Sequence, residues 1–102
     1  MEVGLHTRIK PGSEERYEEY HRAVWPEVIA AIKAAGIRRY VIFRDGLDLF
    51  HFIECDDYDR AMAEIARDPT SMKWEAEIAE MMAVTHDFSG QAGDRMRKIW
   101  EL

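Results

Sequence analysis

The sequence has almost no cysteine and no long apolar segment. Its 102 residues include one cysteine, Cys55, so no disulfide can form within the chain and nothing indicates an oxidising compartment. No apolar run approaches the roughly 20 residues that span a bilayer, and the N-terminus lacks the apolar core of a secretion signal. No lysine–arginine stripe is present, and the formal net charge of −6 argues against nucleic acid as a partner. We therefore expect a cytoplasmic protein that binds neither membrane nor nucleic acid.

The motifs of several enzyme classes are also missing. The sequence has no glycine-rich phosphate loop, no GxSxG and no reactive-cysteine pattern, and Cys55 is expected to be a small apolar side chain. His6 and His51 could fall on neighbouring strands near Glu54, but no HxxxH, HxH or CxxC spacing accompanies them. We therefore expect no metal site.

The residues that are present describe one α+β domain over 1–102. Hydrophobic residues make up 47% of the chain and charged residues 33%, the balance of a globular domain with one modest core. Alternation of apolar and polar residues predicts strands over 3–9, 38–44 and 48–54, and a final strand over 95–102. Asp45-Gly46 supplies the positive φ values that a tight hairpin between the second and third strands requires.

Helix signals lie between these strands. Ser13 is a plausible N-cap for a helix that reaches Ala35 and ends at Gly36, with a break near Val24–Trp25 because Pro26 cannot continue a helix. Asp56 or Asp57 is expected to cap a helix to about residue 67, and Pro69 to begin another to about residue 83. The polar and glycine-rich segment 85–94 is predicted to be a loop.

The resulting order, β-α-β-β-α-α-β, predicts helices on one face of a mainly antiparallel sheet. In the hairpin, Val41 and Phe43 alternate with Tyr40 and Ile42, so both faces are apolar. A sheet with one face in water should alternate apolar with polar residues, and this chain has no spare element to cover a second face. We therefore expect a homodimer formed through the sheet.

Tyr17 and His21 are the first candidates for chemistry. They are four residues apart, so they project from one helix face. His21 is expected in the last turn before the proline break, where the helix dipole would raise its pKa and suit it to general acid/base work near neutrality. The alternative is an ordinary surface histidine on a charged helix.

The aromatic residues allow two interpretations. Trp25 and Trp100 are expected in the core or at a dimer interface. Trp74 lies at helical spacing with Ile78 and Met81, which favours the core, although an indole could also form the floor for the apolar face of a sugar. Tyr40 could line a pocket, or be a buried tyrosine whose hydroxyl meets a backbone carbonyl.

Several stretches resemble the L-rhamnose mutarotase family. They are RYEEYHRAVWPEV (16–28), AAGIRRYVIFRDG (34–46), LFHFIE (49–54), DPTSMKWEAEIAEMM (68–82) and the ending RMRKIWEL, and together they span nearly the whole chain. The tyrosine-x₃-histidine-x₃-tryptophan-proline run is the most specific of them. The resemblance implies a ferredoxin-like antiparallel sheet in a dimeric α+β barrel, and interconversion of the α and β anomers of a 6-deoxy-aldohexose without a cofactor.

The resemblance also implies site residues. His21 matches the family's proton donor, while Tyr17 and Tyr40 match substrate-contacting tyrosines. The family has two adjacent tryptophans in the last helix; here Trp74 is followed by Glu75. A carboxylate accepts hydrogen bonds from sugar hydroxyls where an indole would stack, so the preferred sugar could be L-rhamnose or a relative such as L-fucose.

The residues are suited to mutarotation, which needs one proton delivered to the ring oxygen and one removed from the anomeric hydroxyl. His21 can perform one half, with a tyrosine, a carboxylate or water assisting the other. Two alternatives stay open, because fold alone does not fix function: a small dimeric oxygenase of the same architecture, or a non-catalytic binding module.

Overall fold

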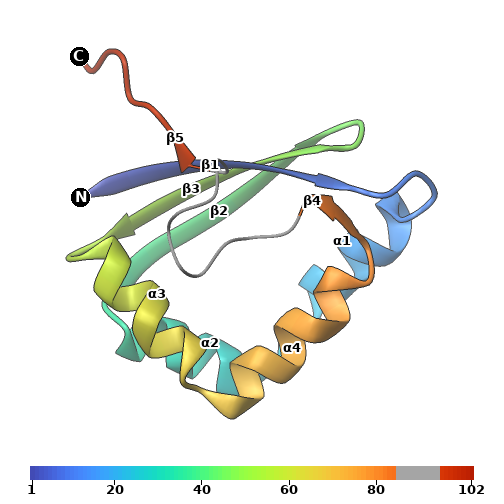
Figure 1. Cartoon of the computed structure of the whole chain (residues 1–102), viewed down its shortest axis with the longest axis horizontal. Coiled ribbons are helices and arrows are strands. Elements are labelled where there is room, and N and C mark those ends of the chain that lie inside the picture. The colour runs from blue at the N-terminus through green and yellow to red at the C-terminus, as the bar shows by residue number, and fades with distance from the viewer. Residues whose placement is uncertain (85–94) are drawn as a thin grey trace.

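The computed structural model describes residues 1–84 and 95–102, which form an antiparallel sheet with helices on one side (Figure 1). The sheet has the order β2-β3-β1-β4, and the short β5 also pairs with β1. In chain order the elements are β1 (Glu2–Ile9), α1 (Glu14–Arg22), α2 (Pro26–Ala34), β2 (Ile37–Asp45), β3 (Asp48–Cys55), α3 (Tyr58–Ala66), α4 (Pro69–Ala79), β4 (Met82–Val84) and β5 (Arg95–Met96). The α+β, ferredoxin-like architecture expected from the sequence is confirmed.

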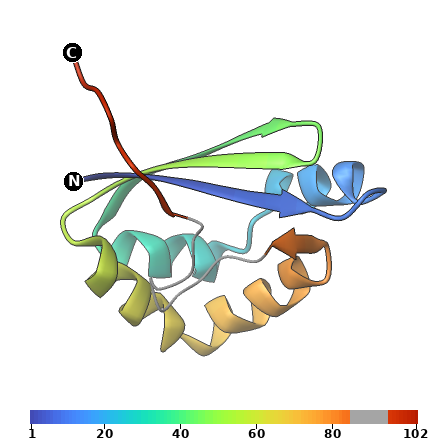
Figure 2. The same ribbon diagram turned by 45° about the horizontal axis from the view of Figure 1, so that its top comes forward.

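Strand alternation decides which side chains face the helices. The inner face of β1 carries Val3, Leu5, Thr7 and Ile9, all buried. His51 pairs with Leu5 of β1 on one side and with Ile42 of β2 on the other. His51 and Ile42 therefore also belong to the inner face. The helices lie on that side of the sheet (Figure 1), and α2, α3 and α4 are also seen below it in Figure 2.

The proline break and two of the caps form as predicted. Helix α1 ends at Arg22 and α2 begins at Pro26, with Trp25 extended between them. Gly36 follows α2 with φ +90°, a value that only glycine adopts readily. Asp57 caps α3 by accepting from the backbone N–H of Arg60 at 3.1 Å.

Three local predictions were wrong or only partly right, and a fourth is not tested. Ser13 precedes α1, but its hydroxyl makes no capping bond; the Glu14 carboxylate instead accepts from the Gly12 N–H. Helix α4 stops at Ala79 because residues 82–84 pair with β1 as β4, so tertiary pairing overrides local helix propensity. Only 95–96 of the predicted final strand is a strand. The predicted loop, 85–94, lies outside the described residues.

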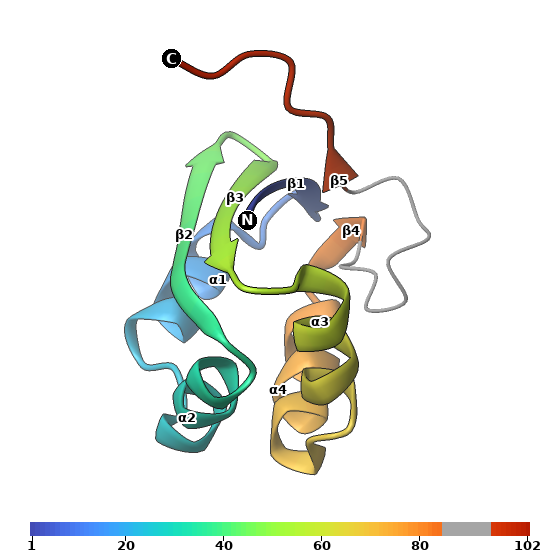
Figure 3. The same cartoon turned by 90° about the vertical axis from the view of Figure 1, so that its left-hand side faces the viewer.

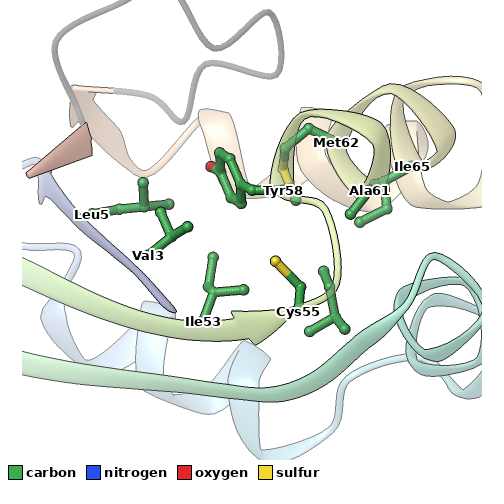
Figure 4. Close-up of a cluster of buried hydrophobic side chains, with 9 residues drawn as sticks. Val3, Leu5, Ile53, Cys55, Tyr58, Ala61, Met62 and Ile65 are labelled. Atoms are coloured by element: carbon green, nitrogen blue, oxygen red, sulfur yellow. The ribbon is translucent and has the colours of Figure 1, made fainter. Parts of the chain in front are cut away.

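The core has two parts along the sheet. One lies under α3 and contains the buried Cys55, a small apolar side chain as expected (Figure 4). Its residues are Val3, Leu5, Ile37, Ile53, Cys55, Tyr58, Ala61, Met62 and Ile65. The other lies under α1, α2 and α4 and consists of Ile9, Tyr17, Val28, Leu49, Trp74, Ile78, Met81 and Met82. Trp25 packs against this second part, which confirms the core prediction for that tryptophan.

On the outer face of the sheet, the hairpin of β2 and β3 carries apolar side chains that the described residues cover only in part. Val41 opposes Phe52, and Phe43 opposes Phe50, with Phe43 63% exposed. The C-terminal residues leave the body on the side away from the helices, and Trp100 is 73% exposed (Figure 3). Trp100 is therefore not a core residue. Within residues 1–84 and 95–102, no helix has the length and apolar character needed to cross a membrane.

Candidate functional site

A cavity of about 340 Å³ lies between the helices and the inner face of the sheet. Tyr17 and His21 line it from α1, Tyr40 from β2, and Trp74 from α4. The structure thus brings all four predicted site residues to one cavity. The rest of the lining is mixed, with Glu75 and His51 as further polar groups and an apolar remainder of Ile42, Met72, Ala76, Ile78, Ala79 and Met82.

His21 is held by its own helix. Its Nδ1 lies 2.8 Å from the carbonyl oxygen of Tyr17, and since a carbonyl only accepts, Nδ1 carries the proton. The neutral ring therefore has its lone pair on Nε2. The ring centroids of Tyr17 and His21 lie 4.3 Å apart, as expected for neighbours one helical turn apart. This arrangement provides one nitrogen that can accept a proton from a ligand.

The predicted direction of the His21 pKa shift was wrong. Burial lowers the pKa of His21 below its ordinary value of 6.5, and the hydrogen bond to the Tyr17 carbonyl opposes this only in part. The helix dipole does favour imidazolium at this position, but the cost of removing a charged ring from water is larger. His21 is therefore predominantly neutral at pH 7 and can act as a base.

Trp74 is both a core residue and a wall of the cavity. Its side chain is only 4% exposed, and it meets the edge of the His21 ring with centroids 5.9 Å apart. Trp25 packs on it in a T-shaped contact at 5.2 Å, and Tyr20 lies at 5.6 Å. Offset and edge-on aromatic contacts of this kind stabilise a fixed ring orientation. The indole is thus positioned rigidly beside His21.

Glu75 brings a carboxyl group into the same cavity. Burial raises its pKa from 4.5 to about 7, because the charged form is poorly solvated there. Burial and the negative charge of Glu75 together raise the pKa of the Tyr17 hydroxyl, which stays protonated at neutral pH. The sequence marked Glu75 as a departure from the family pattern but did not predict its burial, which depends on the packing of α4 against α1 and the sheet.

The sheet side of the cavity contains a hydrogen-bonded group that sequence reasoning missed. The Tyr40 hydroxyl lies 3.0 Å from Nδ1 of His51, and the Thr7 hydroxyl lies 2.9 Å from Nε2 of the same ring. Thr7 is fully buried and His51 is 6% exposed. The signal was available: a histidine and a threonine occupy inward positions of otherwise apolar strands, and buried polar groups require partners.

A larger hollow of about 510 Å³ adjoins the first. The two share His21, Tyr40, Ile42, Trp74 and Glu75. The larger one extends along α2 and the start of β2, where Lys33, Arg38 and Arg39 lie. The shared residues therefore mark the place where a ligand would meet both titratable groups and the aromatic wall.

The histidines considered for metal binding are on opposite faces of the sheet. His6 pairs with Phe50 and stacks on its ring at 5.0 Å on the outer face, whereas His51 pairs with Leu5 on the inner face. His6 instead contacts Asp48 at 2.8 Å. Over the described ranges, 1–84 and 95–102, no three histidine, cysteine or carboxylate side chains gather as metal ligands would.

Both sequence comparisons with known proteins match one family. The sequence model of the L-rhamnose mutarotase family matches residues 2–102. An L-rhamnose mutarotase from Opitutus terrae is 33% identical over 96 residues, covering 92% of this chain and 90% of that protein. The crystal structure of L-rhamnose mutarotase FA22100 from Formosa agariphila superposes with a TM-score of 0.80 at 21% identity, covering 100% of this chain and 98% of that one. A dimeric ferredoxin-like protein from an uncultured marine organism has a TM-score of 0.58 at 18% identity, covering 83% and 80%. At such identities the two structures show the fold alone.

Proposed function

The chain belongs to the L-rhamnose mutarotase family, and we propose that it interconverts the α and β anomers of a 6-deoxy-aldohexose by general acid/base ring opening. The observation that carries this proposal is the position of the His21 imidazole in a cavity wall, with Nδ1 bonded to a carbonyl and Nε2 left as the proton acceptor. L-rhamnose is the first candidate substrate because the relatives of this chain bear that name. The proposal includes a cytoplasmic location.

The cavity lining suits a deoxy sugar. Hydroxyl groups of the sugar can meet Tyr17, Tyr40 and Glu75, while the apolar side chains Ile42 and Met82 offer a surface for a methyl group and C–H bonds. Trp74 lines the same cavity from α4, so the exposed part of its indole can meet the apolar side of a sugar ring. A molecule with both polar and apolar faces therefore fits this lining better than a purely apolar one.

The reaction needs only proton transfer. A base removes the proton of the anomeric hydroxyl as the bond between C1 and the ring oxygen breaks, and an acid protonates that oxygen; the product is the open-chain aldehyde. Rotation about C1–C2 followed by the reverse steps closes the ring on the other face. His21 supplies one of these two transfers. A positioned group of this kind typically contributes about 10²–10⁴ in rate.

The proposal also includes a homodimer. The outer sheet face with Val41, Phe43, Phe50 and Phe52 is the surface that a second copy would cover. Sedimentation equilibrium of the wild type is expected to give twice the chain mass. Phe43→Lys places a charge on that face and should give the monomer mass, whereas Ala63→Lys, on the helix side in α3, should keep the dimer. A monomeric wild type would contradict this part of the proposal.

Anomer exchange followed by saturation-transfer NMR tests the activity. L-rhamnose, L-fucose and related sugars are each measured with wild type and with His21→Ala at equal concentration. At least one sugar should exchange faster with the wild type by about 10² or more. Equal rates for the two proteins on every sugar would remove the basis of the proposal.

The alternatives raised by the sequence are less well supported. Membership of a family of carbohydrate isomerases favours an enzyme over a non-catalytic module. An oxygenase of the same architecture would consume oxygen with its substrate, and no observation on the described residues of this site favours that reaction.

A further inference from the structure

Glu75 differs from the other carboxylates of its helix. Glu77 accepts a hydrogen bond from the Tyr20 hydroxyl at 3.3 Å, and Glu80 pairs with Arg16 at 3.4 Å. Glu75 is half-buried and lines both hollows, yet within residues 1–84 and 95–102 it has neither an ion-pair partner nor a hydrogen bond. Burying a carboxyl group without a partner costs free energy, so its presence here calls for a role toward a ligand.

We propose that Glu75 is the second proton-transfer group of this site, acting with His21 on the two oxygens bonded to the anomeric carbon. This inference rests on the proposed mutarotase function and assigns the partner that ring opening requires. It concerns a position where the resemblance implies a second tryptophan, so the assignment applies to this chain and follows from its own geometry.

Three observations place Glu75 near His21. Both residues line the smaller cavity and both line the larger one. Trp74, the neighbour of Glu75 in the chain, packs on the edge of the His21 ring and is fixed by its burial. Tyr17, which stacks beside His21, experiences the charge of Glu75. A sugar bound where the two hollows meet would therefore reach the carboxyl group and the imidazole together.

The protonation states complement one another. Burial raises the pKa of Glu75 to about 7 and lowers that of His21 below 6.5, so near pH 7 a protonated carboxyl group coexists with a neutral imidazole. In ring opening, Nε2 of His21 takes the proton of the anomeric hydroxyl, its oxygen forms the carbonyl, and the Glu75 carboxyl group protonates the ring oxygen as that C–O bond breaks. Closing the ring returns both protons, so the pair is regenerated without a co-reactant.

Other titratable groups border this pair. Tyr17, Tyr40 and His51 lie in the smaller cavity, and Lys33, Arg38 and Arg39 line the larger one. The raised pKa of Glu75 comes from burial, with no contribution from the three cations. Because those groups remain in place when Glu75 is replaced, a matched variant isolates the contribution of the carboxyl group.

The test compares Glu75→Gln with Glu77→Gln. Glutamine keeps the shape and hydrogen bonding of the side chain but cannot transfer a proton, and Glu77 is the control on the same helix. With saturating amounts of the sugar that the wild type exchanges fastest, E75Q should lower the exchange rate about 10²-fold or more while the sugar's Kd changes less than fivefold. E77Q should stay within twofold of the wild type. The circular dichroism of both variants checks the fold.

The pH profile supplies a readout that a structural role would not change. The wild-type rate at saturation should fall as pH rises above about 7, where Glu75 loses its proton, and the residual rate of E75Q should lack this decline. A folded E75Q with wild-type rate, or with an unchanged profile, would overturn the assignment of Glu75 and leave the mutarotase proposal intact. A wild type with no exchange on any deoxy sugar would instead overturn the proposed function and this inference with it.

Discussion

The two histidines of the cavity differ in how many of their nitrogens are already used. His21, on the helix wall, makes one hydrogen bond through Nδ1, to the carbonyl of Tyr17. His51, on the sheet wall, has both nitrogens within bonding distance of hydroxyl groups, those of Tyr40 and Thr7. The ring of His51 is thus fully satisfied and nearly buried, whereas Nε2 of His21 can meet a ligand.

The two sides of the cavity therefore have different roles. We call the side with His21 and Glu75 the reactive wall, and the side with Tyr40, His51 and Thr7 the supporting wall. In the reactive wall, burial lowers the pKa of His21 below its ordinary value and raises that of Glu75 to about 7. In the supporting wall, the Thr7–His51 and His51–Tyr40 hydrogen bonds, which we call the His51 relay, hold the Tyr40 hydroxyl in one orientation for a ligand. Pre-organisation of this kind lowers the entropic cost of binding a small ligand.

Replacing the two histidines one at a time should give the largest difference between the two walls. His21→Gln is expected to lower the exchange rate by about 10²–10⁴, because it removes the proton acceptor. His51→Gln should act mainly on stability and on the Kd of the sugar, because its ring is a support for Tyr40. Saturation-transfer rates at saturating sugar measure both variants. Equal losses of rate would mean that the two walls do not divide the work in this way.

The second-largest effect is expected in the pH dependence of stability, through Glu75 in the reactive wall. The pKa of Glu75 is raised from 4.5 to about 7 in the folded chain, so between these values the folded state keeps a proton that the unfolded state has lost. The free energy of unfolding contributed by this group therefore falls as pH rises through that window, by on the order of 3 kcal/mol. The lowered pKa of His21 acts in the opposite direction, so the comparison requires a matched variant.

Urea unfolding of wild type and Glu75→Gln at pH 5 and pH 8 measures this contribution. E75Q should gain stability relative to the wild type at the higher pH, with little difference at the lower one. A difference between the two proteins that is independent of pH would show that Glu75 titrates normally in the folded chain.

A smaller effect is expected from Thr7, at the buried end of the His51 relay. Thr7→Val keeps the shape of the side chain but leaves a nitrogen of His51 without its hydroxyl partner. Such a loss should lower the free energy of unfolding by about 1–3 kcal/mol, measured by urea denaturation. The exchange rate at saturating sugar should stay within threefold. A stability unchanged by this substitution would mean that the Thr7–His51 bond contributes nothing net.

The smallest effect is expected from Tyr40, at the end of the His51 relay that faces the ligand. Tyr40→Phe removes one hydroxyl and should weaken sugar binding by up to about tenfold, the size of one ordinary hydrogen bond. Isothermal titration with L-rhamnose measures the Kd. A hundredfold loss of exchange rate at saturation, with Kd unchanged, would move Tyr40 from the supporting wall to the reactive one.

Local sequence signals predicted most of the fold because its elements carry their own start and stop residues. Pro26, Gly36 and Asp57 act through the backbone of their immediate neighbours, so their effects can be inferred without knowledge of the tertiary structure. The strand β4 was missed because its pairing with β1 depends on residues some 75 positions away in the chain. The final strand was overpredicted because alternation alone cannot show whether a partner strand is within reach.

The candidate site divides in the same way. The spacing of Tyr17 and His21 predicts their shared helix face, and the resemblance to a family supplies Tyr40 and Trp74. Solvation could not be predicted: whether burial or the helix dipole decides the pKa of His21 depends on what packs over the ring. The His51 relay likewise requires the register between β1, β3 and β2.

Nitrogen NMR of the histidine rings tests the division between the two walls most directly. The protein labelled with ¹⁵N-histidine is titrated with L-rhamnose at pH 7, and the ring nitrogens are assigned with His21→Gln and His51→Gln. His21 should show a protonated Nδ1 and an unprotonated Nε2, and the Nε2 resonance should shift on binding. The resonances of both His51 nitrogens should not shift. A shift confined to His51, with His21 unaffected by saturating sugar, would contradict the account.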